Sequence, residues 1–399
     1  MSTDDTLSRF AHQLGYRLAR AKQRFDRRIG KTDQPFVVPY LSFGNESEAL
    51  LLGRVLLNPG ITPASPDDGW WRNFLNTYRR AETDELGGVG LRLHAFDNSV
   101  EATSDSEGYY ETRLKVLRID RQQSWHPLRA ELLPPIEAAV AAGKVLVPPP
   151  TAEFGVISDL DDTVLRTNVQ SLIRMLRATV FENARTRLPF RGVAAFYEAL
   201  QGGSSGSAGN PIFYVSGSPW NLYDFLEEFL SVQRIPLGPL LLRDWGMKPR
   251  PTSSAAHKLD RIEQILVMYP RMRFVLIGDS GEADPEIYRT IVARHPERIL
   301  GAYIRNVTPH PERSASIQAL IEEVQAVGCT MVLSDDTVSA AVHAAERGWI
   351  RADAVAAIRD DEQKDAPRAQ PRRARHSAAN TVEVEESGRV HGEKRGRGE

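Results

Sequence analysis

Short apolar runs alternate with helix-like stretches over residues 151–358. Each run is almost continuously apolar, which is typical of strands buried on both faces of a parallel sheet. The runs cover residues 154–157, 212–215, 274–277, 299–304 and 331–333. Between them, apolar side chains recur at helical spacing over residues 220–230, 256–268, 285–294 and 316–326. This alternation predicts an α/β domain with a buried parallel sheet, in which ligands bind beyond the carboxyl ends of the strands.

A different pattern precedes this domain. Short segments rich in β-branched, aromatic and apolar residues are separated there by turn-forming Gly, Asn, Asp and Pro. The segments cover residues 36–40, 48–57, 88–97 and 108–116. They predict an all-β, sandwich-like domain over residues 37–150, which ends at a stiff run of three prolines at 148–150.

The two ends of the chain carry their own charge patterns. Residues 1–36 hold eight Lys/Arg against four Asp/Glu, and Phe10, Leu14, Leu18 and Ala21 recur among them at helical spacing. This basic arm is interpreted either as an amphipathic helix resting on an anionic membrane or as a solvated helix packed on its own protein. Residues 359–399 combine many charges with no aromatic, Leu, Ile or Met side chain, so we expect a disordered tail.

Composition narrows the classes of protein. The chain has 50 Lys/Arg and 52 Asp/Glu, a formal net charge of −2, which excludes a nucleic-acid binder that acts through bulk positive charge. The single cysteine, Cys329, excludes an internal disulfide framework and a cysteine-rich zinc site. No apolar run reaches 18 residues and the N-terminus does not resemble a signal peptide. We therefore expect a cytoplasmic protein, whose contact with a membrane is peripheral if the basic arm supplies one.

Side chains that can carry chemistry follow the apolar runs. Asp159 and Asp161 leave the first run at positions i and i+2, so one carboxylate can attack an electrophile while the other handles a proton. Ser216 and Gly217 follow the second run, where a hydroxyl and backbone N–H groups can hold a phosphoryl oxygen. An ordinary helix start at Ser218 is the alternative for this second motif.

Acidic residues follow the third run. Asp279 and Asp284 offer hard oxygen ligands of the kind that Mg²⁺ prefers. Lys258, in the helix-like stretch before that run, can neutralise the charge of a phosphorylated aspartate. The alternatives are a helix cap at Asp284, which precedes a proline, and a solvated surface lysine.

The joint occurrence of these motifs resembles the haloacid dehalogenase superfamily. Its aspartate-nucleophile phosphatases use a DxDx[TV] motif, a strand-end Ser/Thr, a Lys and an acidic GDxxxxD-like element. Six segments further resemble the catalytic domain of the Mg²⁺-dependent phosphatidate phosphatases of the fungal actin-patch type, which is related to the lipin catalytic domain. The segments cover residues 154–169, 186–200, 210–230, 236–246, 257–266 and 274–288. The resemblance spans about residues 151–350 and implies a Rossmann-like haloacid dehalogenase fold in a bacterial-type member.

The resemblance implies roles for the first motif and for the metal. Asp159 would be the nucleophile that forms an aspartyl-phosphate, Asp161 the general acid and base, and Thr163 a support for their loop. Mg²⁺ would be bound by Asp159, Asp279 and the backbone carbonyl of Asp161. Asp284 is a further candidate ligand.

The remaining motifs would bind the substrate. By the same resemblance, Ser216, Gly217 and Lys258 would hold the phosphoryl group. Arg166 belongs to an arginine-rich segment after the first motif, which is interpreted either as a small cap that meets an acidic lipid head group or as an amphipathic helix packed on the domain. An apolar cluster beside Ser216 is interpreted either as a contact for acyl chains or as core; it consists of Trp220, Leu222, Tyr223 and Phe225.

We therefore expect an Mg²⁺-dependent phosphatase that acts through an aspartyl-phosphate, with phosphatidate as the favoured substrate and diacylglycerol and phosphate as products. A soluble phosphomonoester is the alternative substrate. A module that binds phosphatidate without hydrolysis is an alternative of another class, against which the intact Asp159 and Asp161 argue.

Overall fold

The computed structural model describes six parts of the chain. These are residues 34–58, 87–136, 140–160, 192–243, 253–307 and 310–365. Most of the predicted basic arm and of the predicted tail lie outside the described residues, as does the arginine-rich segment after the first motif. Within the described parts, no helix combines the length and the apolar character needed to cross a membrane.

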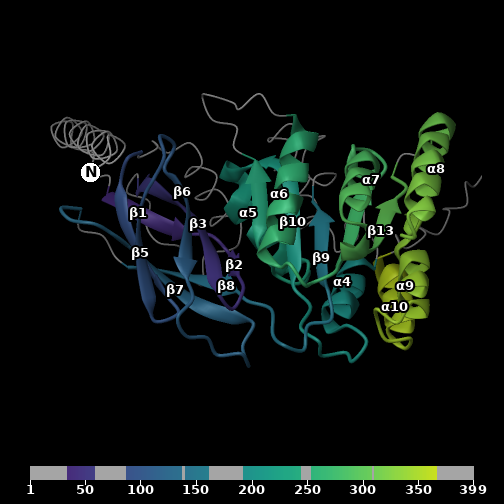
Figure 1. Cartoon of the computed structure of the whole chain (residues 1–399), viewed down its shortest axis with the longest axis horizontal. Helices are drawn as coiled ribbons and strands as arrows, with labels where there is room; N and C mark the ends of the chain where they lie inside the picture. Colours follow the sequence, from purple (N-terminus) through teal and green to yellow (C-terminus); the bar gives the residue numbers. More distant parts are fainter. Residues whose placement is uncertain are drawn as a thin grey trace, which may run out of the picture. The chain divides into compact units, whose positions relative to one another are not determined.

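The N-terminal described part is a mostly antiparallel sheet, which confirms the predicted β-rich region (Figure 1). Hydrogen bonds link its strands in the order β1-β3-β2-β8-β7-β4-β5, with β6 paired to β3. Only β2 and β8 run parallel. The strands are β1 (Gln34–Pro39), β2 (Ser42–Gly44), β3 (Glu48–Asn58), β4 (Gly90–Ala95), β5 (Asn98–Thr103), β6 (Tyr109–Lys115), β7 (Trp125–Leu132) and β8 (Ala141–Leu146). Alternate residues of β4 and β7 are buried, because one face of this sheet encloses an apolar core.

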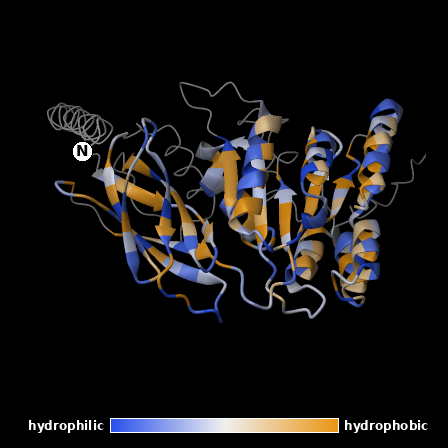
Figure 2. Cartoon of the chain, viewed as in Figure 1, coloured by the Kyte–Doolittle hydropathy of each residue, from blue (hydrophilic) through white to orange (hydrophobic). Residues whose placement is uncertain are grey.

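The second part contains a six-stranded sheet whose pairs are all parallel. The strands are β9 (Gly155–Asp159), β10 (Ile212–Pro219), β11 (Leu240–Arg243), β12 (Phe274–Asp279), β13 (Ile299–Arg305) and β14 (Met331–Ser334), and their order is β11-β10-β9-β12-β13-β14. The strands appear in Figure 2 as apolar segments, as expected for strands with helices on both sides. The chain order reverses between the neighbours β9 and β12, which is where open α/β sheets bind ligands.

Helices alternate with these strands, as the sequence predicts. They are α4 (Val193–Gly202), α5 (Tyr223–Val232), α6 (Ser254–Met268), α7 (Asp284–Arg294), α8 (Pro311–Ala326), α9 (Thr337–Glu346) and α10 (Ala354–Asp365), with short 3-10 turns at Trp220–Leu222 and Pro296–Arg298. Ser158 contacts Tyr197 of α4, whereas Asp159 pairs with Lys258 of α6. Because successive strand residues face opposite sides, α4 and α6 cover opposite faces of the sheet.

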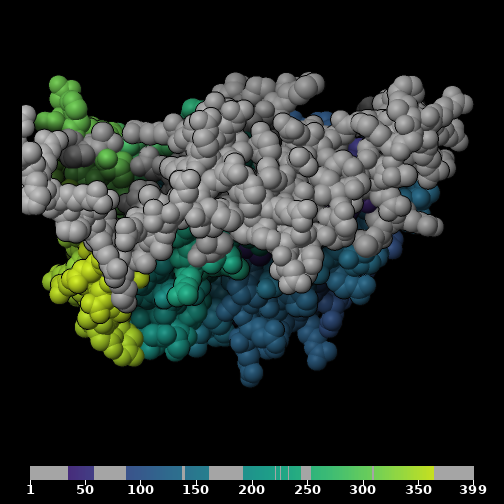
Figure 3. Space-filling view, turned by 180° about the vertical axis from the view of Figure 1, so that it is seen from behind, coloured from purple at the N-terminus to yellow at the C-terminus, as the bar shows by residue number. Residues whose placement is uncertain are grey.

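The last described helix continues into the predicted tail. α10 extends to Asp365, so the first residues of the segment expected to be disordered are helical. Its Ile358 is fully buried while most of its other side chains are exposed. These C-terminal described residues lie at the surface in Figure 3. The burial of Ile358 explains why α10 is helical although the segment is rich in charge, because tertiary packing of an apolar side chain stabilises a helix more than intrinsic propensity does.

Aromatic packing joins the two sheets. Tyr40 stacks on Tyr223, with ring centroids 3.8 Å apart, and on Trp220, with centroids 5.0 Å apart. The backbone N–H of Leu41 donates to the Tyr223 hydroxyl at 2.6 Å. Trp220 and Tyr223 are therefore core residues, which confirms the core interpretation for these two members of the apolar cluster.

A buried asparagine fixes the entry to β9. The Asn210 side chain is fully buried; its Oδ1 accepts from the N–H groups of Glu153 and Phe154 at 2.7 and 3.2 Å, and its Nδ2 donates to the Leu200 carbonyl at 2.8 Å. We expect Asn210→Ala to lower the free energy of unfolding by about 3 kcal/mol, because two buried backbone groups and a partly buried one lose their partner. Urea denaturation measures this change. Gln123→Ala, at an exposed amide, should cost less than about 0.5 kcal/mol.

Glu227 of α5 makes the stability depend on pH. Burial and the nearby Asp224 raise its pKa to about 7, against the opposing charge of Lys144. The Glu227 carboxyl group therefore binds its proton more tightly in the folded protein than in the unfolded chain. As pH rises from about 4.5 to about 7, this difference lowers the free energy of unfolding. Glu227→Gln should be more stable than the wild type by about 1–3 kcal/mol at pH 8 and nearly equal to it at pH 4. Unfolding curves at both pH values test this, with the exposed Glu322→Gln as control.

Candidate active site

Three carboxylates meet at the carboxyl edge of the parallel sheet. β9 ends at Asp159, β12 ends at Asp279, and α7 begins at Asp284. β9 and β12 are hydrogen-bonded neighbours, with Ile277 opposite Ser158, so their last residues lie close together. One carboxylate oxygen from each aspartate lies within 4.8 Å of the others. This cluster of hard oxygen ligands could hold a metal ion, and its chemistry fits Mg²⁺.

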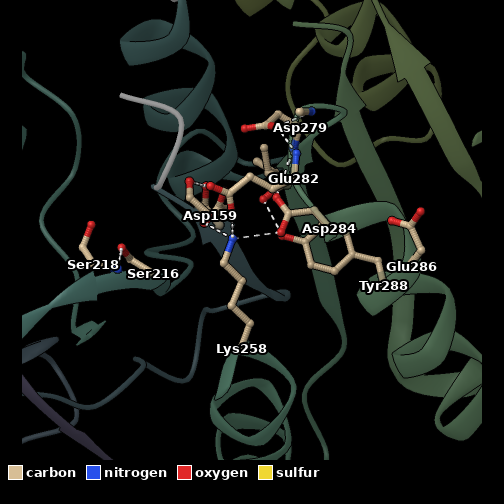
Figure 4. Close-up of polar contacts among 12 residues, drawn as sticks. Asp159, Ser216, Ser218, Lys258, Asp279, Glu282, Asp284, Glu286 and Tyr288 are labelled. Carbon is tan, nitrogen blue, oxygen red and sulfur yellow. Dashed lines mark hydrogen bonds and ion pairs between the residues drawn. The ribbon is translucent and has the colours of Figure 1, made fainter. Parts of the chain in front are cut away.

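A buried lysine lies among these carboxylates (Figure 4). The Lys258 Nζ is 2.7 Å from Asp159 Oδ1, 3.0 Å from Asp284 Oδ1 and 3.0 Å from Glu282 Oε2. Its side chain is only 4 % exposed, so the interpretation as a solvated surface lysine is wrong. A buried ammonium is tolerated because charged partners surround it. The Ser253 hydroxyl caps α6 by accepting from the Ala256 N–H, which sets where the helix starts and hence where Lys258 points.

Asp284 is turned toward the site and does not cap its helix. Its Oδ2 accepts from the Asp279 N–H at 3.1 Å, its side chain is fully buried, and α7 has no side-chain cap hydrogen bond at Ala283. The helix-cap alternative for Asp284 is therefore wrong. The absence of a side chain at Gly278 leaves room for the Asp284 carboxylate, because a Cβ at residue 278 would lie 2.4 Å from Asp284 Oδ2.

The loop after β12 folds around Asp279. Its Oδ1 accepts from the backbone N–H groups of Gly281 and Glu282 at 2.7 and 3.2 Å. The same turn brings Glu282 to Lys258. The Asp279 carboxylate therefore organises the loop that delivers two further carboxylates to the cluster.

The predicted serine motif lies on the neighbouring strand. Val215 of β10 is in register with Asp159 of β9, so Ser216 and Gly217 extend just beyond the position of that aspartate. Ser216 is fully buried, and its Oγ accepts from the Ser218 N–H at 3.0 Å (Figure 4). β10 continues to Pro219, and the 3-10 turn that follows has no side-chain cap. The alternative of a helix cap at Ser218 is therefore wrong.

The structure thus brings together Asp159, Lys258, Asp279 and Asp284, with Ser216 and Gly217 on the adjacent strand. Asp161, Thr163 and Arg166 lie outside the described residues, so their roles stay predictions.

Two residues near the cluster are absent from the sequence-based prediction. Glu282 contacts Lys258, and Arg305, the last residue of β13, is in register with Asp279. Arg305 lines a cavity together with Asp159 and Asp279, and most of the remaining lining is aromatic or aliphatic, such as Phe196 and Leu230. The signal for Arg305 in the sequence is its position directly after the apolar run 299–304, at the end of β13.

A strand-end aspartate, a buried lysine and a carboxylate cluster that could hold a metal ion thus meet at the carboxyl edge of a parallel sheet, an arrangement of the kind used in phosphoryl transfer. Residues 154–306 match the family model of the phosphatidate phosphatase APP1 catalytic domain. This part of the chain is therefore similar to the APP1-type phosphatidate phosphatase catalytic domain.

Two yeast relatives share this part of the chain. The phosphatidate phosphatase APP1 of Saccharomyces cerevisiae is 35 % identical over 155 residues, which are 38 % of this chain and 26 % of that protein. An uncharacterized protein of Schizosaccharomyces pombe is 30 % identical over 157 residues, which are 39 % of this chain and 25 % of that protein. The chain thus spans about a quarter of the length of these curated relatives, and the homology is distant.

Likeness to solved structures is weak. A carbohydrate acetylesterase from Xanthomonas citri is 11 % identical, with a TM-score of 0.23 over 73 % of this chain and 75 % of that chain. Such a score supports no conclusion about fold or function.

Gly278 gives a test of the cluster. We expect Gly278→Ala to displace the Asp284 carboxylate, because the added methyl group overlaps it, and to weaken binding of Mg²⁺ by about tenfold or more. Isothermal titration calorimetry measures the affinity. Gly202→Ala, where the nearest atom to the added methyl group is the Ser207 backbone nitrogen at 4.0 Å, an ordinary contact distance, is the matched control. Equal affinity in both variants and the wild type would show that Asp284 does not bind the ion.

Proposed function

We propose that this protein is an Mg²⁺-dependent phosphatase that uses Asp159 as nucleophile and phosphatidate as substrate. The observation that carries the chemistry is the position of Asp159 at the end of β9, 2.7 Å from the buried Lys258 and in one cluster with Asp279 and Asp284. The match of residues 154–306 to the phosphatidate phosphatase family supports the choice of substrate. The apolar lining of the cavity beside Asp159 and Asp279 is consistent with a substrate that carries acyl chains.

In the first step, a carboxylate oxygen of Asp159 forms a bond to the phosphorus atom while the bond between phosphorus and the alcohol oxygen breaks. The leaving alcohol takes a proton from Asp161. In the second step, a water molecule gives a proton to Asp161 and attacks the phosphorus of the aspartyl-phosphate. The bond between phosphorus and Asp159 breaks, phosphate leaves, and both carboxyl groups return to their starting state.

Positive charge is required because a carboxylate and a phosphate dianion repel each other. Lys258 provides part of that charge from a buried position, where electrostatic interactions are strong. Asp159, Asp279 and Asp284, with the backbone carbonyl of Asp161, would hold Mg²⁺. When bound, the ion offsets the negative charge of the phosphoryl oxygens.

Other residues hold the substrate in this proposal. Ser216 and Gly217, on the strand next to Asp159, bind the phosphoryl oxygens, and Arg166 contacts the acidic head group. Thr163 supports the loop that carries Asp161. These roles follow from the motif positions, and mutation of each residue tests them separately.

The direct test is phosphate release from phosphatidate in mixed micelles, with Mg²⁺ or with EDTA. We expect metal-dependent release by the wild type and a loss of roughly 10³-fold or more in Asp159→Asn, because an amide cannot form the acyl phosphate. Asp353→Asn, at an exposed aspartate paired with Arg351, is the matched control and should keep wild-type activity.

The other outcomes separate the alternatives. Metal-dependent release from small phosphomonoesters without release from phosphatidate would keep the mechanism and replace the lipid by a soluble substrate. Binding of phosphatidate vesicles without hydrolysis of any substrate would refute the enzyme and favour a lipid-binding module.

A further inference from the structure

Arg313 of α8 binds backbone carbonyl groups of the acidic loop between Asp279 and Asp284. The Arg313 Nε donates to the Ser280 carbonyl at 2.9 Å, and its Nη2 donates to the Glu282 carbonyl at 2.6 Å. Both carbonyls belong to the loop that follows β12. Arg313 is separated from this loop by about 30 residues of sequence and reaches it from a different helix, so the contact depends on the tertiary fold.

The same guanidinium also binds the first turn of α7. Its Nη1 is 2.5 Å from Glu286 Oε1, and its Nη2 is 3.1 Å from Glu286 Oε2. A planar guanidinium has donors on three nitrogens in a fixed fork, so it can hold one carboxylate and two carbonyls at once. An ammonium has its three donors on a single nitrogen and cannot span these acceptors.

The loop is thereby held from two sides. On the inner side, the N–H groups of Gly281 and Glu282 donate to Asp279 Oδ1. On the outer side, the Glu282 carbonyl accepts from Arg313. The peptide groups around Glu282 thus connect Asp279 to Arg313 through backbone, and a shift of Arg313 would move the N–H groups that orient the Asp279 carboxylate.

Arg313 keeps its charge in this position. Its hydrogen bond to Glu286 raises its pKa, and the negative charges of Glu286, Asp279 and Asp284 act in the same direction. A permanent positive charge therefore lies close to two of the candidate metal ligands.

We infer that Arg313 is a positioning residue for the metal cluster: it fixes the 279–284 loop in the shape that lets Asp279 and Asp284 bind one divalent cation. The inference rests on the proposed function, because it assigns Mg²⁺ to that cluster. Arg313 acts through the loop backbone and makes no contact with the substrate in this scheme. The competing explanation is that Arg313 only packs α8 against α7.

A matched control separates the two explanations. Arg289 of α7 pairs with Glu323 of α8 at 2.8 Å, so Arg289→Gln removes an ion pair between the same two helices without touching the loop. Arg313→Gln removes the loop contacts. Arg313→Lys keeps the positive charge but loses the planar set of guanidinium donors that reaches the carboxylate and both carbonyls. Thermal unfolding of all three variants reports their effect on stability.

Amide hydrogen exchange tests the positioning without any metal or activity. We expect the Gly281 and Glu282 amides to exchange about tenfold faster in Arg313→Gln than in the wild type, because their acceptor is less well ordered. Arg289→Gln should leave these two amides unchanged. Equal exchange in Arg313→Gln and the wild type would overturn the inference.

Titration with Mg²⁺ tests the functional consequence. We expect Arg313→Gln to weaken Mg²⁺ binding in calorimetry by about 10–100-fold, and to raise by the same factor the Mg²⁺ concentration that half-saturates hydrolysis of a small phosphomonoester. The KM of the substrate at saturating Mg²⁺ should change less than about threefold, since Arg313 does not hold the substrate. Arg313→Lys should recover little of the affinity.

The outcomes distinguish this inference from the proposed function. A wild type that hydrolyses with Mg²⁺ while Arg313→Gln keeps the same Mg²⁺ affinity overturns the role of Arg313 and leaves the phosphatase standing. Full recovery in Arg313→Lys also overturns it, because charge alone would then suffice. If the wild type binds Mg²⁺ but hydrolyses no substrate, the proposed phosphatase function is refuted. The Mg²⁺ affinities of the variants, measured by calorimetry, then still test the positioning role of Arg313.

Discussion

The buried ion cluster around Lys258 is the constraint on which the site depends. An ammonium that is almost fully removed from water is stable only with charged partners. Asp159 supplies one from the end of β9, and Glu282 and Asp284 supply two more from the loop before α7 and its first residue. The end of β9, the start of α7 and the middle of α6 must therefore converge at one point. The parallel sheet makes this convergence possible, because it delivers the ends of β9 and β12 to the same edge.

Much of this arrangement could be predicted from local sequence. The near-continuous apolar runs locate five of the six parallel strands, and the acids that follow two of them locate Asp159 and Asp279 at the sheet edge. β11 was missed because its four residues, Leu240–Arg243, are too short to stand out from a proline- and leucine-rich stretch. α9 is not among the predicted helical stretches; its N-terminus is capped by Asp336, whose carboxylate accepts from the Ser339 N–H at 2.7 Å.

The direction of side chains could not be predicted in the same way. Asp284 before a proline has every local mark of a helix cap, yet its carboxylate turns back to the Asp279 N–H and to Lys258. A lysine in a helical pattern is usually solvated, and only the order of the motifs indicated that Lys258 is not. The contacts of Lys258 with Glu282 and Asp284 join residues 24 and 26 positions apart, which local periodicity does not encode. The contacts of Arg313 with the acidic loop belong to the same category.

The candidate nucleophile and most of the candidate metal ligands lie on different segments of the chain. The candidate nucleophile lies on β9, whereas two of the three candidate metal ligands lie on β12 and α7, in a loop that is held by Gly278, by its own Asp279 carboxylate and by Arg313. Disturbing that loop moves the metal ligands but leaves Asp159 at its strand end. Two of the three candidate metal ligands are therefore positioned by residues that do not position Asp159, which is itself the third candidate ligand and belongs to both parts of the site.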